Sequence, residues 1–127
     1  MFFLRGIPLY FRRLQHADLK YSYYNLMNLL SNTNIDMINE LTEDKLFEKL
    51  DDDHHIFVIV NENINMIVGT ATIYVLNKNT RYTIVIIKEI KINKEYEKKQ
   101  ILYTKFVNYL IEYSFNSLMC VKYLIRE

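Results

Sequence analysis

The middle of the chain carries three β-rich segments in close succession, and this feature restricts the fold more than any other. Residues 56–60, 66–75 and 82–92 are dominated by β-branched, aliphatic and aromatic side chains. Polar clusters at 61–63 and 77–80 separate them and are typical of turns. The sequence therefore predicts successive strands joined by hairpins, with 82–92 as the longest.

A helical pattern follows the longest of these strands. Its apolar stripe consists of Leu102, Phe106, Tyr109, Leu110 and Tyr113. Residues 120–125 then have the length and composition of a last short strand. Because a strand–helix–strand crossover makes its two strands parallel, we expect 82–92 and 120–125 to run in the same direction.

The first part of the chain adds one strand and two helices to this order. Residues 9–14 predict a first strand, and Asp18 opens a segment with apolar residues at helical spacing up to Leu30. Thr42 has the character of an N-cap for a second, shorter helix. The predicted order is β-α-α-β-β-β-α-β, an α/β (α+β) mixed sheet, and without a Pro/Gly-rich linker or repeat we expect a single domain over 1–127.

Charge, cysteine content and hydropathy exclude several classes of protein. Lys and Arg number 16 against 15 Asp and Glu, a net charge of +1, which argues against a strongly basic nucleic-acid binder. One cysteine excludes an internal disulfide framework and favours a reducing compartment. Apolar runs are far below the ~18 residues that cross a bilayer. We expect a cytoplasmic protein with no nucleic-acid or membrane partner.

The run Asp51–His55 and the lone Cys120 contain ligand-type and nucleophile-type side chains. Adjacent residues rarely converge on one ion, and His54 and His55 on a strand point to opposite faces, so we expect no metal. A cysteine nucleophile needs a paired base. Since no histidine can be argued to lie beside Cys120, we expect it to be a small buried residue of the last strand.

Four segments carry a resemblance to a known family. They are Tyr10-Phe11-Arg12-Arg13-Leu14 with Asp18-Leu19, Gly69-Thr70-Ala71-Thr72-Ile73, Lys88-Glu89-Ile90-Lys91-Ile92-Asn93, and Cys120-Val121-Lys122. Together they resemble the Gcn5-related N-acetyltransferases (GNAT), and among them glucosamine 6-phosphate N-acetyltransferase. The resemblance implies the GNAT acyl-CoA N-acyltransferase fold and runs without a gap from Gly69 to Glu127.

The sequence departs from that family in two places. The diphosphate motif, rich in glycine in the family, is matched by residues 97–102, which contain none. Glycines there let backbone N–H groups approach a diphosphate at a helix N-terminus, and side chains in their place crowd it. The family also continues beyond the last strand, so we expect a divergent member whose C-terminal elements are missing, or a chain in which another residue has taken over their work.

The resemblance implies an acetyl-CoA-dependent N-acetyltransferase in which the amine attacks the thioester directly, a step toward UDP-N-acetylglucosamine. It assigns the catalytic contacts to Glu89, at the acceptor amine, and to the backbone N–H of Ile90, at the thioester oxygen. Coenzyme contacts fall on Ile90, Lys91, Ile92, Glu97, Lys98, Lys99, Gln100, Ile101, Leu102 and Tyr103. Contacts to an amino-sugar phosphate fall on Ser31, Asn77, Lys78, Asn79, Lys88 and Glu89. It also implies a homodimer.

Simpler interpretations of the same residues remain open. Glu89 is also compatible with a solvated strand position near Lys88 and Lys91, and Lys98 and Lys99 with an ordinary charged first turn. The alternative class of function is a catalytically inactive GNAT-like module that uses an open sheet edge for interaction, since an exposed edge strand pairs readily with another chain.

Overall fold

The structure is a computed structural model that describes residues 2–15, 18, 54–79, 82–97 and 100–126; for 77–79 and 97 it describes the backbone alone. The two helices predicted between Asp18 and residue 50, and the candidate Ser31, lie outside the described residues. Within the described part, no helix is long and apolar enough to cross a membrane.

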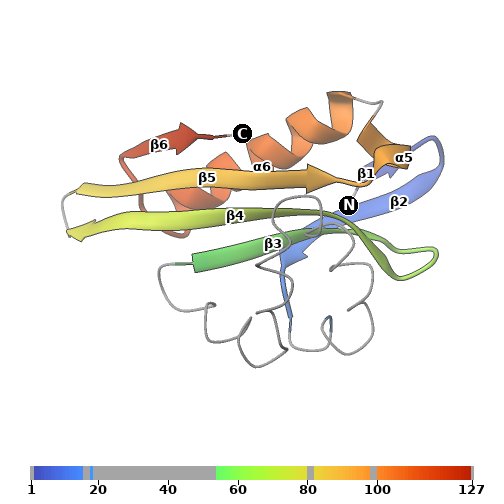
Figure 1. The fold of residues 1–127 in the computed structure, drawn as a ribbon, viewed down its shortest axis with the longest axis horizontal. Coiled ribbons are helices and arrows are strands. Elements are labelled where there is room, and N and C mark those ends of the chain that lie inside the picture. The colour runs from blue at the N-terminus through green and yellow to red at the C-terminus, as the bar shows by residue number, and fades with distance from the viewer. Residues whose placement is uncertain (1, 16–17, 19–53, 80–81, 98–99, 127) are drawn as a thin grey trace, which may run out of the picture.

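One mixed sheet of six strands forms the framework, and its strands lie side by side in chain order (Figure 1). In the part of the chain that the structure describes, the strands are β1 (Phe2–Leu4), β2 (Ile7–Arg13), β3 (His54–Asn61), β4 (Met66–Asn79), β5 (Tyr82–Ile92) and β6 (Lys122–Ile125), and the helices are α5 (Lys94–Glu97) and α6 (Gln100–Asn116). Neighbouring strands are antiparallel except β5 and β6, which are parallel. The predicted mixed sheet and the parallel crossover are therefore confirmed.

The ends of the sheet differ from the sequence-based prediction. β1 pairs with β2 through a tight turn at Arg5 and Gly6, both with positive φ (49° and 79°), as in the two-residue hairpin turns that match strand twist. This hairpin was not predicted, because a strand of three residues is too short to show a period. β2 consequently begins at Ile7 rather than at residue 9.

Two predicted boundaries are wrong. Residues 77–79 were predicted as a turn, but they continue β4 in register with β5, from Asn77↔Ile84 to Asn79↔Tyr82. Pairing with β5 overrides the turn preference of these polar residues, because the ladder satisfies their backbone groups. At the other end of the chain, β6 begins at Lys122, so buried Cys120 precedes the strand instead of opening it.

The core lies between α6 and one face of the sheet. On α6, Leu102, Phe106 and Leu110 are fully buried. On β3, the Phe57 ring lies 4.7 Å from that of Tyr113, so His55, Phe57 and Ile59 face the helix. Because side chains alternate along a strand, the residues between them, from His54 onward, face the other side of the sheet.

Candidate functional site

An irregularity in β5 distinguishes the middle of the sheet. Thr70 pairs with Lys91 and Thr72 with Lys88, so Glu89 and Ile90 together occupy the place of one residue opposite β4. Glu89 has a φ of 58°, a conformation uncommon for residues with a side chain. Such a bulge re-aims side chains, and here it turns Glu89 toward the face that carries Thr72 and Tyr74.

The carboxylate of Glu89 accepts hydrogen bonds from two residues of β4. The hydroxyl of Thr72 donates to Oε2 at 3.3 Å, and that of Tyr74 donates to Oε2 at 3.4 Å and to Oε1 at 3.5 Å. Burial, and then the negative charge of Glu89 and the hydrogen bond to it, raise the pKa of Tyr74 to about 12. Tyr74 therefore remains a protonated donor throughout the physiological pH range.

Two further basic side chains surround the Tyr74 ring. Lys88 Nζ lies 4.1 Å from the ring centroid, a cation–π distance, and the His54 ring meets it edge-on at 4.5 Å. His54 comes from β3, whose pairing with β4 sets it opposite Tyr74. The face of the sheet away from α6 thus carries a carboxylate and a cation from β5, a phenol from β4 and an imidazole from β3. We call Thr72, Tyr74, Lys88 and Glu89 the bulge cluster.

The bulge also lies where β5 and β6 part. Their register pairs run from Ile84↔Lys122 to Ile87↔Ile125, and the Arg126 N–H closes the ladder on the Ile87 carbonyl at 2.9 Å. β5 continues beyond this point over Lys88–Ile92, and Figure 1 shows β6 beside only the first part of β5. Glu89, Ile90, Lys91 and Ile92, all predicted site residues, are in this stretch.

The turn that follows β5 is fixed by its own hydrogen bonds. Asn93 donates its backbone N–H to the Val68 carbonyl at 2.7 Å, and its side-chain oxygen accepts from the N–H of Glu95 at 3.1 Å. Tyr96 is buried in α5, and its hydroxyl accepts a hydrogen bond from the side-chain amide of Asn61 at 2.9 Å. These contacts hold α5 against the sheet directly before α6.

The start of α6 presents a mixed set of predicted coenzyme residues. Gln100 and Ile101 are exposed, Tyr103 is partly buried, and the Leu102 side chain is fully buried in the core, so only its backbone is available to a ligand. The first turn carries no acidic residue, which leaves the positive end of the helix dipole without an internal counter-charge. Lys98 and Lys99 lie outside the described residues.

The predicted acceptor residues do not all come together. Lys88 and Glu89 are in the bulge cluster, but residues 77–79 pair with the opposite end of β5, about 20 Å away at the usual rise of a strand. Thr72 and Tyr74 were missed by the sequence analysis. Their spacing of two on a predicted strand indicated a shared face, but nothing in the sequence indicated that a bulge would bring Glu89 to it.

The prediction that His54 and His55 point to opposite faces is confirmed. His54 meets Tyr74, whereas His55 lies near Tyr113 of α6. Within the residues that the structure describes, no three His, Cys, Asp or Glu side chains form a possible metal site. Cys120 is buried, and burial raises the pKa of its thiol.

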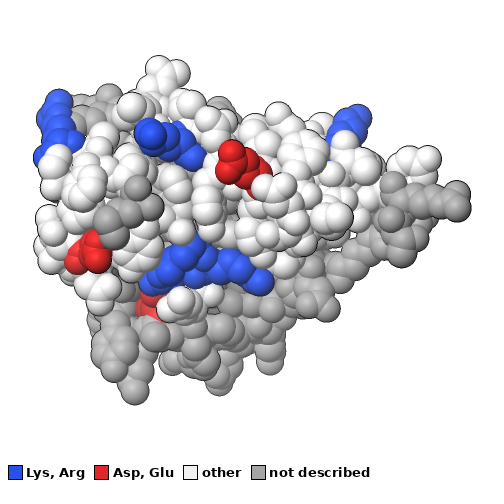
Figure 2. Space-filling model, turned by 180° about the vertical axis from the view of Figure 1, so that it is seen from behind, with Lys and Arg blue, Asp and Glu red and all other residues white. Residues whose placement is uncertain are grey.

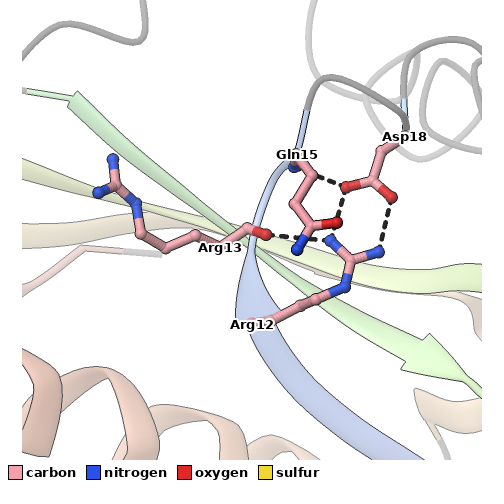
Figure 3. Close-up of polar contacts among 4 residues, drawn as sticks. All are labelled: Arg12, Arg13, Gln15 and Asp18. Atoms are coloured by element: carbon pink, nitrogen blue, oxygen red, sulfur yellow. Dashed lines mark hydrogen bonds and ion pairs between the residues drawn. The ribbon is translucent and has the colours of Figure 1, made fainter.

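Charged side chains on the side of the molecule seen from behind Figure 1 form a few small patches (Figure 2). Figure 2, seen from behind the view of Figure 1, shows a few basic and acidic patches among largely uncharged surface, and the most extended basic patch adjoins an acidic one. The best defined of the charge contacts is at the end of β2, where the Arg12 guanidinium binds both carboxylate oxygens of Asp18 at 2.6 Å (Figure 3). The Gln15 N–H donates to the same carboxylate at 2.7 Å. This bidentate pair fixes the chain as it leaves the sheet.

The sequence matches no family model and has no significant match among curated proteins. Solved structures do match its fold. Glucosamine-6-phosphate N-acetyltransferase from Arabidopsis thaliana gives a TM-score of 0.71 at 21% identity, over 94% of this chain and 82% of its own. A GNAT family acetyltransferase from Staphylococcus aureus gives a TM-score of 0.69 at 19% identity, over 94% of this chain and 86% of its own. An aminoglycoside acetyltransferase from an uncultured soil metagenomic sample gives a TM-score of 0.69 at 19% identity, over 94% of this chain and 77% of its own.

The protein therefore has the GNAT acetyltransferase fold, as its sequence resemblance predicted. Glucosamine-6-phosphate N-acetyltransferase, the enzyme that the sequence resembles, is among the structures that share this fold. Others with the same fold are described by different acceptors, so the likeness establishes the architecture and not the substrate.

Proposed function

We propose that this protein is an N-acetyltransferase that uses acetyl-CoA as cosubstrate and a primary amine as acceptor. The observation that carries the proposal is the position of the Glu89 carboxylate, at a bulge within the stretch of β5 that β6 leaves unpaired. A free strand edge offers backbone hydrogen bonds to an extended pantetheine arm, and a carboxylate next to it meets the needs of an amine acceptor.

The chemistry requires one bond to form and one to break. The neutral amine attacks the thioester carbonyl carbon, a C–N bond forms, the C–S bond breaks, the amine gives up a proton and the departing thiolate takes one. In this proposal Glu89 contacts the amine, and the backbone N–H of Ile90 stabilises the charge that develops on the thioester oxygen. Lys91 and Ile92 lie along the pantetheine arm.

The diphosphate of the coenzyme is proposed to bind at the start of α6. The positive end of the helix and the backbone around Gln100 and Ile101 supply donors, and Lys98 and Lys99 supply charge in place of the missing glycines. The contacts between Asn61 and Tyr96 and between Asn93 and Val68 support this proposal, because they hold the preceding turn in one position.

The finer proposal concerns the acceptor, which we propose to be an amino-sugar phosphate such as glucosamine 6-phosphate. It is supported by the sequence resemblance and by Lys88, a cation that directly precedes Glu89 at the bulge. A carboxylate for the amine and a cation for the phosphate suit a substrate that carries both groups.

The test of this function is coenzyme binding followed by turnover. Calorimetry with coenzyme A should give a dissociation constant in the micromolar range, and a thiol-release assay with acetyl-CoA and glucosamine 6-phosphate should give turnover. Glu89→Gln should keep coenzyme affinity and lose most of the turnover. If the wild-type protein binds no coenzyme A, the enzymatic proposal is wrong; if it binds and acetylates other amines only, the acceptor alone is wrong.

A second candidate function is favoured by the outer edge of the sheet. β6 is the last strand in the sheet order and all of its residues are exposed. Its apolar residues Leu124 and Ile125 are 41% and 39% exposed, and Val121, directly before the strand, is 56% exposed. An apolar edge strand favours pairing with another strand. We propose a second copy of this chain as its partner.

Sedimentation equilibrium over a range of concentrations tests this pairing. A dimer that dissociates in Leu124→Lys, with unchanged circular dichroism, would support it. If the protein is a monomer at all concentrations, the proposed pairing between two copies is wrong.

A further inference from the structure

Glu89 is held by two side chains that the sequence resemblance did not assign to any role. Thr72 is 7% exposed and Tyr74 is half-buried, and both come from β4, two residues apart on one face. Both hydroxyls donate to the carboxylate that the bulge turns toward them. Two donors on one side of a carboxylate occupy some of the lone pairs of its oxygens, and the remaining lone pairs can accept hydrogen bonds from another direction.

We propose that Tyr74 and Thr72 are positioning residues for the reaction, which hold the Glu89 carboxylate oriented toward the acceptor amine. This inference rests on the proposed acetyltransferase function. Its basis is geometric, since the φ of 58° at Glu89 brings the side chain to these two hydroxyls. A backbone held in such a sparsely populated conformation persists where surrounding contacts maintain it.

The two donors differ in what they contribute. Thr72 supplies one hydrogen bond, to Oε2 alone, and so restrains one of the two carboxylate oxygens. Tyr74 adds orientation, because its hydroxyl reaches both carboxylate oxygens while its ring is fixed by Lys88 on one side and His54 at its edge. A carboxylate held in the correct orientation toward the amine raises the rate of acetyl transfer. Because this carboxylate does not contact the coenzyme in the proposal, its orientation should not change coenzyme affinity.

The charged and titratable groups around this cluster come from three strands. Lys88 is over the Tyr74 ring and His54 is at its edge, while Lys91 is the next basic residue along β5 beyond the bulge. The negative charge nearest to the phenol in the described structure is that of Glu89. Any change in the titration of Tyr74 after substitution of Glu89 therefore reports on this pair.

The first experiment measures the interaction between Tyr74 and Glu89 and does not require catalytic turnover. Tyrosine labelled with ¹³C at Cζ allows Tyr74 to be titrated by NMR, with its resonance assigned from Tyr74→Phe. Tyr74 should ionise at about pH 12 in the wild type. In Glu89→Gln it should ionise at lower pH, though still above 10, because burial is the larger cause of the raised pKa. An unchanged midpoint in Glu89→Gln would overturn the proposal.

The second experiment measures acetyl transfer. Tyr74→Phe keeps the ring and its contact with Lys88 but removes the donor, so kcat should fall about tenfold while coenzyme affinity stays the same. The KM values for the amine and for acetyl-CoA should stay close to those of the wild type, a split between kcat and KM that a purely structural role would not produce. Thr72→Val should have a smaller effect of the same kind, and Thr72→Ser should restore the rate.

The matched control is Tyr82→Phe, at the exposed start of β5, which should behave as wild type in both experiments. Wild-type kcat in Tyr74→Phe would overturn the positioning role. If the wild-type protein transfers no acetyl group, the proposed function fails, and the NMR titration still decides whether Tyr74 and Glu89 act as a pair.

Discussion

The side-chain amide of Asn61 donates a hydrogen bond to the hydroxyl of Tyr96 at 2.9 Å, and this contact joins the end of β3 to α5. Both residues are buried, with exposed fractions of 4% and 8%. The Asn61 side-chain oxygen also accepts from the N–H of Asn63. The turn of the β3–β4 hairpin and the turn before α6 are thus connected through one asparagine, although they are far apart in sequence.

Removal of the hydroxyl in Tyr96→Phe should therefore destabilise the protein. The Asn61 amide would be left buried without this acceptor, which costs about 1–3 kcal/mol of unfolding free energy. Coenzyme affinity should also fall several-fold, because the turn before α6 loses its anchor. Urea unfolding and calorimetry measure the two effects, and Tyr82→Phe is the control. Equal stability of the two variants would contradict this account.

Gly69→Ala should disturb the centre of the sheet. A Cβ at this position would lie 2.6 Å from Cδ1 and 3.1 Å from Cγ1 of Ile59, and 3.3 Å from the Lys91 carbonyl oxygen. Since Ile59 is fully buried, its side chain has little room to move, and we expect a loss of about 1–3 kcal/mol. The loss should be smaller in an Ile59→Val background, which removes Cδ1. Additive losses in the double-mutant cycle would show that this contact is not the cause.

Asp18→Asn should weaken the end of β2. The Arg12 and Asp18 side chains are 21% and 7% exposed, and the hydrogen bond to Asp18 raises the pKa of Arg12, so the guanidinium stays charged. Loss of its partner charge should lower the unfolding free energy by about 2–3 kcal/mol, below the value for fully buried pairs because Arg12 is partly solvated. The control is Arg13→Ala, since Arg13 is exposed and its side chain points away from the pair (Figure 3). A comparable loss in the control would argue against the ion pair.

Replacement of Lys98 and Lys99 together by Glu tests the proposed diphosphate site. Reversal of two charges at the start of α6 should reduce coenzyme A affinity at least about tenfold, and more at low salt, because screening weakens exposed charges. Calorimetry at two salt concentrations measures it. The double variant Lys122→Glu with Arg126→Glu carries the same change of charge at the exposed β6 and should keep wild-type affinity. Unchanged binding in the first variant would remove these lysines from the site.

Cys120 should react slowly with thiol reagents in the native protein. Its side chain is buried and the pKa of its thiol is raised, so little thiolate is present at pH 8. Reaction with a chromogenic disulfide should accelerate by about two orders of magnitude in denaturing urea. Because the folded form holds the thiol proton more tightly, this group should lower stability as pH rises above about 9. Fast native labelling would refute the burial.

Much of the framework follows from local patterns. The bounds Tyr82–Ile92 of β5 agree with the prediction because β-branched residues dominate the segment, from Thr83 to Ile87 and again at Ile90 and Ile92, between two polar breaks. The parallel pairing of β5 and β6 follows from the helix between them. These properties depend on residues close in sequence, which is why a period or a crossover suffices to predict them.

The candidate site depends on tertiary structure instead. β5 contains no glycine or proline that would mark the bulge at Glu89, which arises from the register between β4 and β5. Thr72 and Tyr74 reach Glu89 only because of that register, and Asn61 reaches Tyr96 across 35 residues. The sequence by itself determined the elements and their order, whereas long-range pairing decided which side chains meet, since register and packing depend on contacts that no local pattern records.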